Sequence, residues 1–183
     1  MSTFRRSVEY ILRNAKLLLS NLDDDKIEDI CKEFLKARRI FLYGAGRSGL
    51  VAKAFAIRLV HLGLQAYVIG ETITPPVREK DLVVVISGSG ETIPSVMTAD
   101  IAKRMGARLI AITSKRDSKI ARRADLPVIL SVDLEDKDRS KLAPLGTIFE
   151  ASSWIFLDGL VARLMEMKGE DEERMKERHA TLQ

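Results

Sequence analysis

Cysteine and histidine are scarce in this chain. The single cysteine, Cys31, excludes an intrachain disulfide, and the two histidines, His61 and His179, provide no Cys/His cluster with the spacing of a metal site. We therefore expect no metal, and a reducing cytoplasm is the default location.

Aromatic residues and long apolar runs are also scarce. Aromatics make up 5% of the 183 residues, and charges of both signs are interleaved to a net charge of only +4. We therefore expect no nucleic-acid partner, because such a protein needs a basic surface and aromatic side chains that stack on bases. The basic run from Lys115 to Arg123 is interpreted as a solvated helix face rather than a phosphate-backbone patch. No apolar run approaches the ~18 residues of a membrane span, so we expect no membrane partner.

Short apolar runs of strand length alternate with helical patterns along the middle of the chain. The predicted strands are 40–43, 66–69, 82–86, 109–112 and 128–132, and the clearest helical patterns between them are 50–62 and 95–105, with Pro94 at a first helical position. Strands that are apolar on both faces are typical of a parallel sheet covered by helices on two sides. The sequence therefore predicts an α/β fold with three α-β-α layers.

Helical segments flank this alternating region. Apolar residues from Phe4 to Leu22 recur at helical spacing, and Asp23 to Asp25 supply an N-cap and first-turn acids for a second helix. A long, largely buried helix is predicted over 147–167, followed by a charged tail over 168–183. No low-complexity linker divides the chain, so we expect one domain over 1–183, with helices 4–37 and the tail as extensions that contact other subunits.

The first glycine-rich turn directly follows a predicted strand and precedes a helix. It reads Gly44-Ala45-Gly46-Arg47-Ser48-Gly49, which matches a dinucleotide-binding fingerprint, and Glu71 lies where a ribose-binding acid would be. Ligands of an open parallel sheet bind beyond the carboxyl ends of its strands, so this turn is a candidate binding site. An NAD-dependent oxidoreductase is therefore one hypothesis.

A second turn of glycines and hydroxyl-bearing residues follows a later predicted strand. It reads Ser87-Gly88-Ser89-Gly90-Glu91-Thr92. A dinucleotide has no need of this second turn, whereas a single phosphate held between two strand ends does, because glycines allow close backbone approach while helix-start amides and hydroxyls donate hydrogen bonds. We therefore favour a phosphate site, with candidate residues Gly46, Arg47, Ser48, Ser87, Gly88, Ser89 and Thr92.

Simpler interpretations of these residues stay open at this point. The serines can be ordinary helix caps, and Arg47 can be a solvated cation at a helix start. Thr113 and Ser114, at the end of a further predicted strand, would extend the hydroxyl rim of the phosphate site.

Glu150 stands out among the acidic residues because its neighbours are apolar and it follows the turn Pro144-Leu145-Gly146 at a predicted helix start. A carboxylate in this position is a candidate proton-abstracting base. The alternative is a first-turn acid that stabilises the helix dipole. His61 lies at a predicted helix end, where a structural histidine or a cation that stabilises the helix dipole is the more common interpretation. His179 lies in the charged tail, where a histidine taken alone is usually inert.

The two turns, together with the segment from Gly70-Glu71-Thr72 to Pro75-Pro76, resemble the sugar isomerase (SIS) domain family. Chain length, motif order and the ending Arg178-His179-Ala180-Thr181-Leu182-Gln183 are similar to the 6-phospho-3-hexuloisomerases of that family. The resemblance covers essentially the whole chain. It implies a five-stranded parallel sheet of the SIS or flavodoxin-like type, no cofactor, and a cytoplasmic homotetramer with active sites at subunit contacts.

The resemblance also implies a reaction. The 6-phospho-3-hexuloisomerases interconvert D-arabino-3-hexulose 6-phosphate and fructose 6-phosphate through a cis-enediolate, in the ribulose monophosphate pathway of formaldehyde fixation, so the expected partner is a small-molecule sugar phosphate. The alternatives are another sugar-phosphate isomerase, such as one acting on arabinose 5-phosphate, a non-catalytic SIS module that binds sugar phosphates, and the NAD-binding oxidoreductase.

Individual roles follow from the same resemblance. Glu150 matches the catalytic carboxylate, His179 matches a C-terminal histidine contributed by a neighbouring subunit, and His61 matches a further histidine near the site. The usual ending carries Asn and Glu where this chain has Thr181 and Gln183, so the resemblance keeps the histidine but does not fix the exact docking of the tail. The sugar-phosphate positions of the family match Ser48, Ser87, Ser89 and Thr92.

Overall fold

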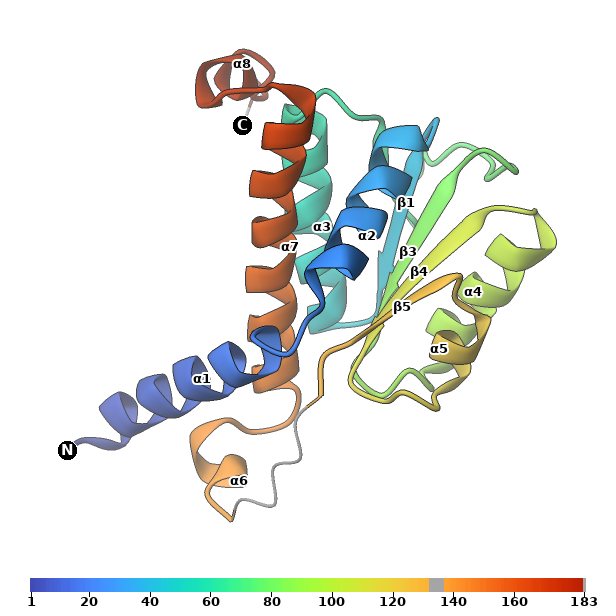
Figure 1. Cartoon of the computed structure of the whole chain (residues 1–183). Coiled ribbons are helices and arrows are strands. Elements are labelled where there is room, and N and C mark those ends of the chain that lie inside the picture. The colour runs from blue at the N-terminus through green and yellow to red at the C-terminus, as the bar shows by residue number, and fades with distance from the viewer. Residues whose placement is uncertain (132–136, 183) are drawn as a thin grey trace.

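A computed structural model describes residues 1–131 and 137–182 of the chain (Figure 1). Its centre is a five-stranded, all-parallel sheet with the strand order β2-β1-β3-β4-β5. This order and the helices on both faces confirm the predicted α/β fold. The strands are β1 (Ile40–Gly44), β2 (Ala66–Val68), β3 (Leu82–Ile86), β4 (Arg108–Thr113) and β5 (Leu126–Ile129).

Helices cover the sheet on both faces because neighbouring residues of each inner strand are buried on opposite sides. On one face Leu42 and Val84 pack in a core with α2 (Asp24–Lys36), α3 (Arg47–His61) and α7 (Thr147–Lys168). On the other face Phe41 and Val85 pack with α4 (Ile93–Arg104) and α5 (Lys119–Arg123). The two separate cores give the predicted three layers.

The remaining helices lie outside these layers. Helix α1 (Thr3–Leu19) packs across α7 and points away from the sheet, beside the short α6 (Arg139–Leu142) (Figure 1). Helix α8 (Glu172–Glu177) follows α7 and packs on α3. Among the described residues, no helix combines the length and the apolar character that crossing a membrane requires.

A buried ion pair fixes the amino end of the sheet, where β1 and β3 start. Arg39 donates from Nε and Nη2 to the two carboxylate oxygens of Asp81, at 3.1 and 2.7 Å. The Asp81 side chain is fully buried and that of Arg39 is 10% exposed. Two parallel hydrogen bonds of this kind hold both residues in one orientation, which ties the starts of the two central strands together.

Several predicted boundaries are corrected by the structure. Strand β5 begins at Leu126, two residues before the predicted start, because an edge strand that pairs only with β4 tolerates Pro127. The strand ends at Ile129, so residues 130 and 131 are not strand as predicted, and Val132 lies outside the described residues. The first helix ends at Leu19 instead of Leu22, since the next residues form the turn before the Asp23 cap.

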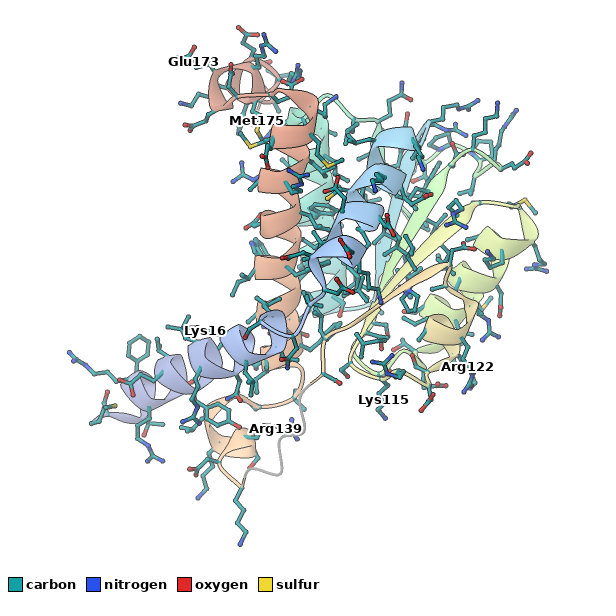
Figure 2. The ribbon with its side chains drawn as sticks, in the orientation of Figure 1. Lys16, Lys115, Arg122, Arg139, Glu173 and Met175 are labelled. Carbon is teal, nitrogen blue, oxygen red and sulfur yellow. The ribbon has the colours of Figure 1, made fainter. Side chains whose placement is uncertain are left out.

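Two further corrections concern the α4–α5 region. Pro94 is the second residue of α4, not the first. Helix α5 begins only at Lys119, so the interpretation of the whole basic run as a helix face is wrong for Lys115 (Figure 2) and Arg116, which are exposed in the turn after β4.

Candidate active site

The two glycine-rich turns leave the sheet side by side. Strands β1 and β3 are neighbours in space but not in sequence, and Gly44 at the end of β1 pairs with Ile86 at the end of β3. In a sheet of this order the crevice between these two strands is the point where crossover connections diverge to opposite faces, which is where such folds bind ligands. The structure therefore brings both candidate motifs to one crevice.

The first turn lies very close to the helix that follows it. A Cβ on Gly44 would lie 2.5 Å from the backbone carbonyl carbon and oxygen of Ser48, so only glycine allows α3 to start this close to the strand. Arg47 and Ser48 are the first two residues of α3, and Gly46 is its N-cap. Backbone amides at a helix start are ready donors for an anion.

The second turn gathers three hydroxyl groups. The Oγ atoms of Ser87 and Ser89 each lie 3.3 Å from Oγ1 of Thr92. Each serine oxygen also accepts a backbone N–H at 3.2 Å, Ser87 from Gly90 and Ser89 from Glu91. The two contacts with Thr92 engage two of the three hydroxyl protons and leave the third to be donated, which suits an anion.

The helix-cap alternative does not account for this cluster. Thr92 is the N-cap of α4, yet its side chain makes no capping hydrogen bond. Ser48 lies inside the first turn of α3 rather than at its cap position. The two hydroxyls are therefore not occupied by helix capping.

Two residues at and just after the end of β4 hold the backbone of the second turn by hydrogen bonds. Thr113 Oγ1 and Ser114 Oγ donate to the carbonyl oxygen of Gly88 at 3.2 and 2.6 Å. Their hydroxyls are thus committed to the backbone, and the expectation that they extend the hydroxyl rim is wrong. The Glu91 carboxylate accepts from the backbone N–H and Nζ of Lys119 at 2.8 and 2.9 Å, and these bonds lower the pKa of Glu91.

The start of α7 contacts both turns. A Cβ on Gly88 would lie 3.1 Å from Cδ1 of Phe149, so the aromatic ring packs directly on the second turn. The next residue, Glu150, accepts a hydrogen bond from Nε of Arg47 in the first turn. The Glu150 side chain is 14% exposed, whereas that of Arg47 is 69% exposed. Glu150 therefore adjoins the crevice as a mostly covered carboxylate held by a solvated cation.

A pocket of about 470 Å³ opens beside this carboxylate. Arg47 and Glu150 supply its charged wall, and most of the other lining side chains are apolar groups from α1, α3 and α7, including Ile11, Leu50 and Trp154. A volume of this size accommodates a small polar metabolite.

The two histidines lie together at the other end of α3. His61 is the last residue of the helix and is buried, and the ring of His179 stacks on it with 4.9 Å between the ring centroids. Burial lowers the pKa of His61, and the neighbouring His179 and Arg58 lower it further. A second pocket of about 440 Å³ lies beside this pair, lined among others by Lys53 and Glu71.

One chain does not bring these histidines to the Glu150 crevice. Ser48 and His61 are 13 residues apart on one α-helix, and at 1.5 Å per residue this is about 20 Å. Glu71, the candidate ribose acid, lines the histidine pocket, and Nζ of Lys53 lies 3.9 Å from it. In the described part of the chain, no three His, Cys, Asp or Glu side chains form a group that could hold a metal ion.

Comparison with known proteins shows which family this chain belongs to. A protein of Archaeoglobus fulgidus described as uncharacterized is 44% identical over 181 residues, which cover 97% of this chain and 99% of that protein. The Bacillus subtilis protein named 3-hexulose-6-phosphate isomerase is 39% identical over 189 residues, covering 97% of this chain and all of the relative.

A crystal structure of a Methanococcus jannaschii protein agrees with the fold throughout. Its TM-score is 0.87 at 34% identity, with 97% of this chain and 99% of that chain covered, and that crystal structure is said to infer a molecular function of 3-hexulose-6-phosphate isomerase for its own protein. The model of the SIS domain matches residues 33–148, which include both turns. As the sequence motifs predict, the chain belongs to the SIS domain family.

Proposed function

We propose that the protein is an isomerase that interconverts D-arabino-3-hexulose 6-phosphate and fructose 6-phosphate. The observation that carries this proposal is that the start of α7 joins the two turns: Phe149 packs on the turn that bears the hydroxyls of Ser87, Ser89 and Thr92, and the covered carboxylate of Glu150 pairs with Arg47 of the first turn. Relatives named 3-hexulose-6-phosphate isomerase, at 39% and 38% identity over most of the chain, support the choice of substrate.

The hydroxyl cluster and the start of α3 are assigned to the phosphate. Ser87, Ser89 and Thr92 donate hydrogen bonds to phosphate oxygens, and the amide and hydroxyl of Ser48 donate from the other side of the crevice. Holding the phosphate fixes the far end of an open-chain sugar, so that its reacting carbons lie beside one side chain and the entropy cost of the reaction falls.

Glu150 is assigned the proton transfer between carbons. It removes the proton from C2 of the 3-hexulose, and the electron pair of the C–H bond forms the C2–C3 double bond of a cis-enediolate. The same carboxylic acid then returns the proton to C3, which leaves the carbonyl at C2, as in fructose 6-phosphate. The oxygens on C2 and C3 exchange a second proton, and an imidazole suits this step because it gives and accepts protons near neutral pH.

His179 and His61 are assigned to that second proton, and this requires a second subunit. The separation of about 20 Å along α3 keeps the pair away from Glu150 of the same chain. A homo-oligomer, expected to be a tetramer, would bring the histidine pair of one subunit to the crevice of its neighbour. We therefore expect the active protein to sediment well above its chain mass of 20.5 kDa.

Mixing inactive variants tests the reaction and the shared site together. Glu150→Gln and His179→Asn are each expected to lose turnover of 3-hexulose 6-phosphate. Co-expression of the two variants should restore part of the activity, because some interfaces then combine an intact Glu150 with an intact His179. Failure of the unaltered protein to isomerise this substrate would overturn the proposed function, and mixtures as inactive as their components would overturn the shared site.

A further inference from the structure

Arg178, the residue before His179, contacts both the end of α3 and the start of the tail. Arg178 Nη1 donates to the backbone carbonyl oxygen of His61 at 3.0 Å, although the two residues are 117 positions apart. Its Nη1 and Nη2 also donate to the two carboxylate oxygens of Glu170, at 2.9 and 3.2 Å. One guanidinium therefore joins the end of α3, the start of the tail and the end of the chain.

The contacts of Arg178 pair its charge with a backbone carbonyl at a helix end and with a mostly covered carboxylate. The carbonyl oxygen of His61 belongs to the last turn of α3, where helical partners are missing and a cation is favoured by the helix dipole. The guanidinium also lies against Gly63, where an added Cβ would be 3.3 Å from its Cζ. Glu170 is 10% exposed, so its charge is well covered by Arg178.

Helix α8 brings Arg178 to this position. Met175 is buried against the core while Glu173 on the same helix points to solvent (Figure 2). The helix ends at Glu177, and Arg178 and His179 follow directly. Among the described residues, the His179 ring itself has one hydrogen-bond contact, Nδ1 with the carbonyl oxygen of its neighbour Ala180 at 3.2 Å. The anchoring of Arg178 therefore sets where this ring lies.

We propose that Arg178 is a positioning residue: its guanidinium holds the tail on the end of α3 so that His179 stacks on the buried His61. This proposal rests on the proposed function for its effect on catalysis, because His179 is assigned the transfer of a proton between the substrate oxygens. The charged groups around the two rings are Arg58, Lys53, Glu71 and Arg178 itself.

Loss of this anchor should affect turnover rather than binding. The phosphate is assigned to the turns at the opposite end of α3, so KM should change by no more than about threefold in Arg178→Ala. A displaced acid–base group costs up to about 100-fold in rate, and we expect kcat to fall by about 10- to 100-fold. Arg174→Ala, an exposed arginine on α8 four residues before Arg178, is the matched control and should leave kcat within about twofold.

Histidine NMR provides a readout independent of activity. The chain has only two histidines, so the ring signals of each are assigned with a single variant. Stacked rings shift each other's resonances, and in Arg178→Ala the His179 signal should move to the position of an unstructured peptide. The pKa of His61 should rise toward its ordinary value, since part of its burial and the nearby His179 are lost.

Each outcome decides one of the two proposals. Unchanged histidine signals in Arg178→Ala, or a loss of kcat without movement of His179, would overturn the positioning role. If Arg178→Ala fails to fold, Glu170→Gln weakens the same anchor and must displace the His179 signal as well. An unaltered protein without isomerase activity would refute the proposed function, while the NMR titration would still decide whether Arg178 holds His179.

Discussion

Replacement of Glu150 by glutamine separates the role of this residue in catalysis from its contribution to the stability of the protein. Glu150→Gln keeps the size of the side chain and removes its charge and its basic oxygen. Arg47, the partner of Glu150, is 69% exposed, so solvent already screens most of this ion pair. A pair of this kind contributes less than about 1 kcal/mol, and the free energy of unfolding should change by no more than that.

The effect on turnover should be much larger. A positioned general base accelerates proton transfer by about 10²- to 10⁴-fold. At about 1.4 kcal/mol for each factor of ten, its loss raises the barrier by about 3–5 kcal/mol. The hydroxyls of the second turn are unaltered, so we expect this loss in kcat with little change in KM.

Formation of fructose 6-phosphate from 3-hexulose 6-phosphate measures this effect, and thermal unfolding measures the stability. Glu166→Gln is the matched control, because Glu166 lies on the same helix, pairs with Arg163 and is 72% exposed. It should leave kcat unchanged. A Glu150→Gln protein that retains kcat within about threefold would refute Glu150 as the base, and a loss of several kcal/mol of stability would refute the electrostatic argument.

Three further predictions follow from the packing. Gly90→Ala should lower the free energy of unfolding by about 1–3 kcal/mol and raise KM, because φ of Gly90 is +64° and the new Cβ would lie 2.2 Å from Ser118 Oγ. The control Gly159→Ala adds a Cβ in open space and should unfold no more easily than the unaltered protein. Asp81→Ala should lower the free energy of unfolding by about 3–5 kcal/mol, since it leaves the buried charge of Arg39 without its carboxylate. Chemical denaturation measures this change, and an unchanged denaturation midpoint would contradict it. The pKa of His61 lies below its ordinary 6.5, so the unfolded chain binds the proton more tightly. Stability should therefore fall as the pH drops below about 6.5, and His61→Asn should flatten this slope.

Much of the fold could be predicted from local patterns. The runs 40–43 and 82–86 match β1 and β3 almost residue for residue, because a strand buried on both faces must be apolar throughout. The turns after these strands were identified from glycine and hydroxyl residues, whose chemistry is also local. Their meeting at one crevice follows from the sheet order, which places β1 beside β3.

Other parts of the site depend on long-range contacts that no local pattern encodes. The contact of Thr113 and Ser114 with Gly88 requires the registration of β3 and β4, and the contact of Arg178 with His61 spans 117 residues. The separation of Ser48 from His61, in contrast, could have been predicted from the sequence. A helix that starts near Ser48 and ends near His61 separates the two residues by about 20 Å, so a single chain could not have joined them.

A crystal structure with bound fructose 6-phosphate tests the central claim most directly. The account predicts that the phosphate lies between the two turns, within hydrogen-bond distance of Ser87, Ser89 and Thr92, with C2 or C3 of the sugar beside the Glu150 carboxylate. A phosphate bound elsewhere on the molecule, or a dinucleotide stretched across the ends of β1 and β3, would contradict it.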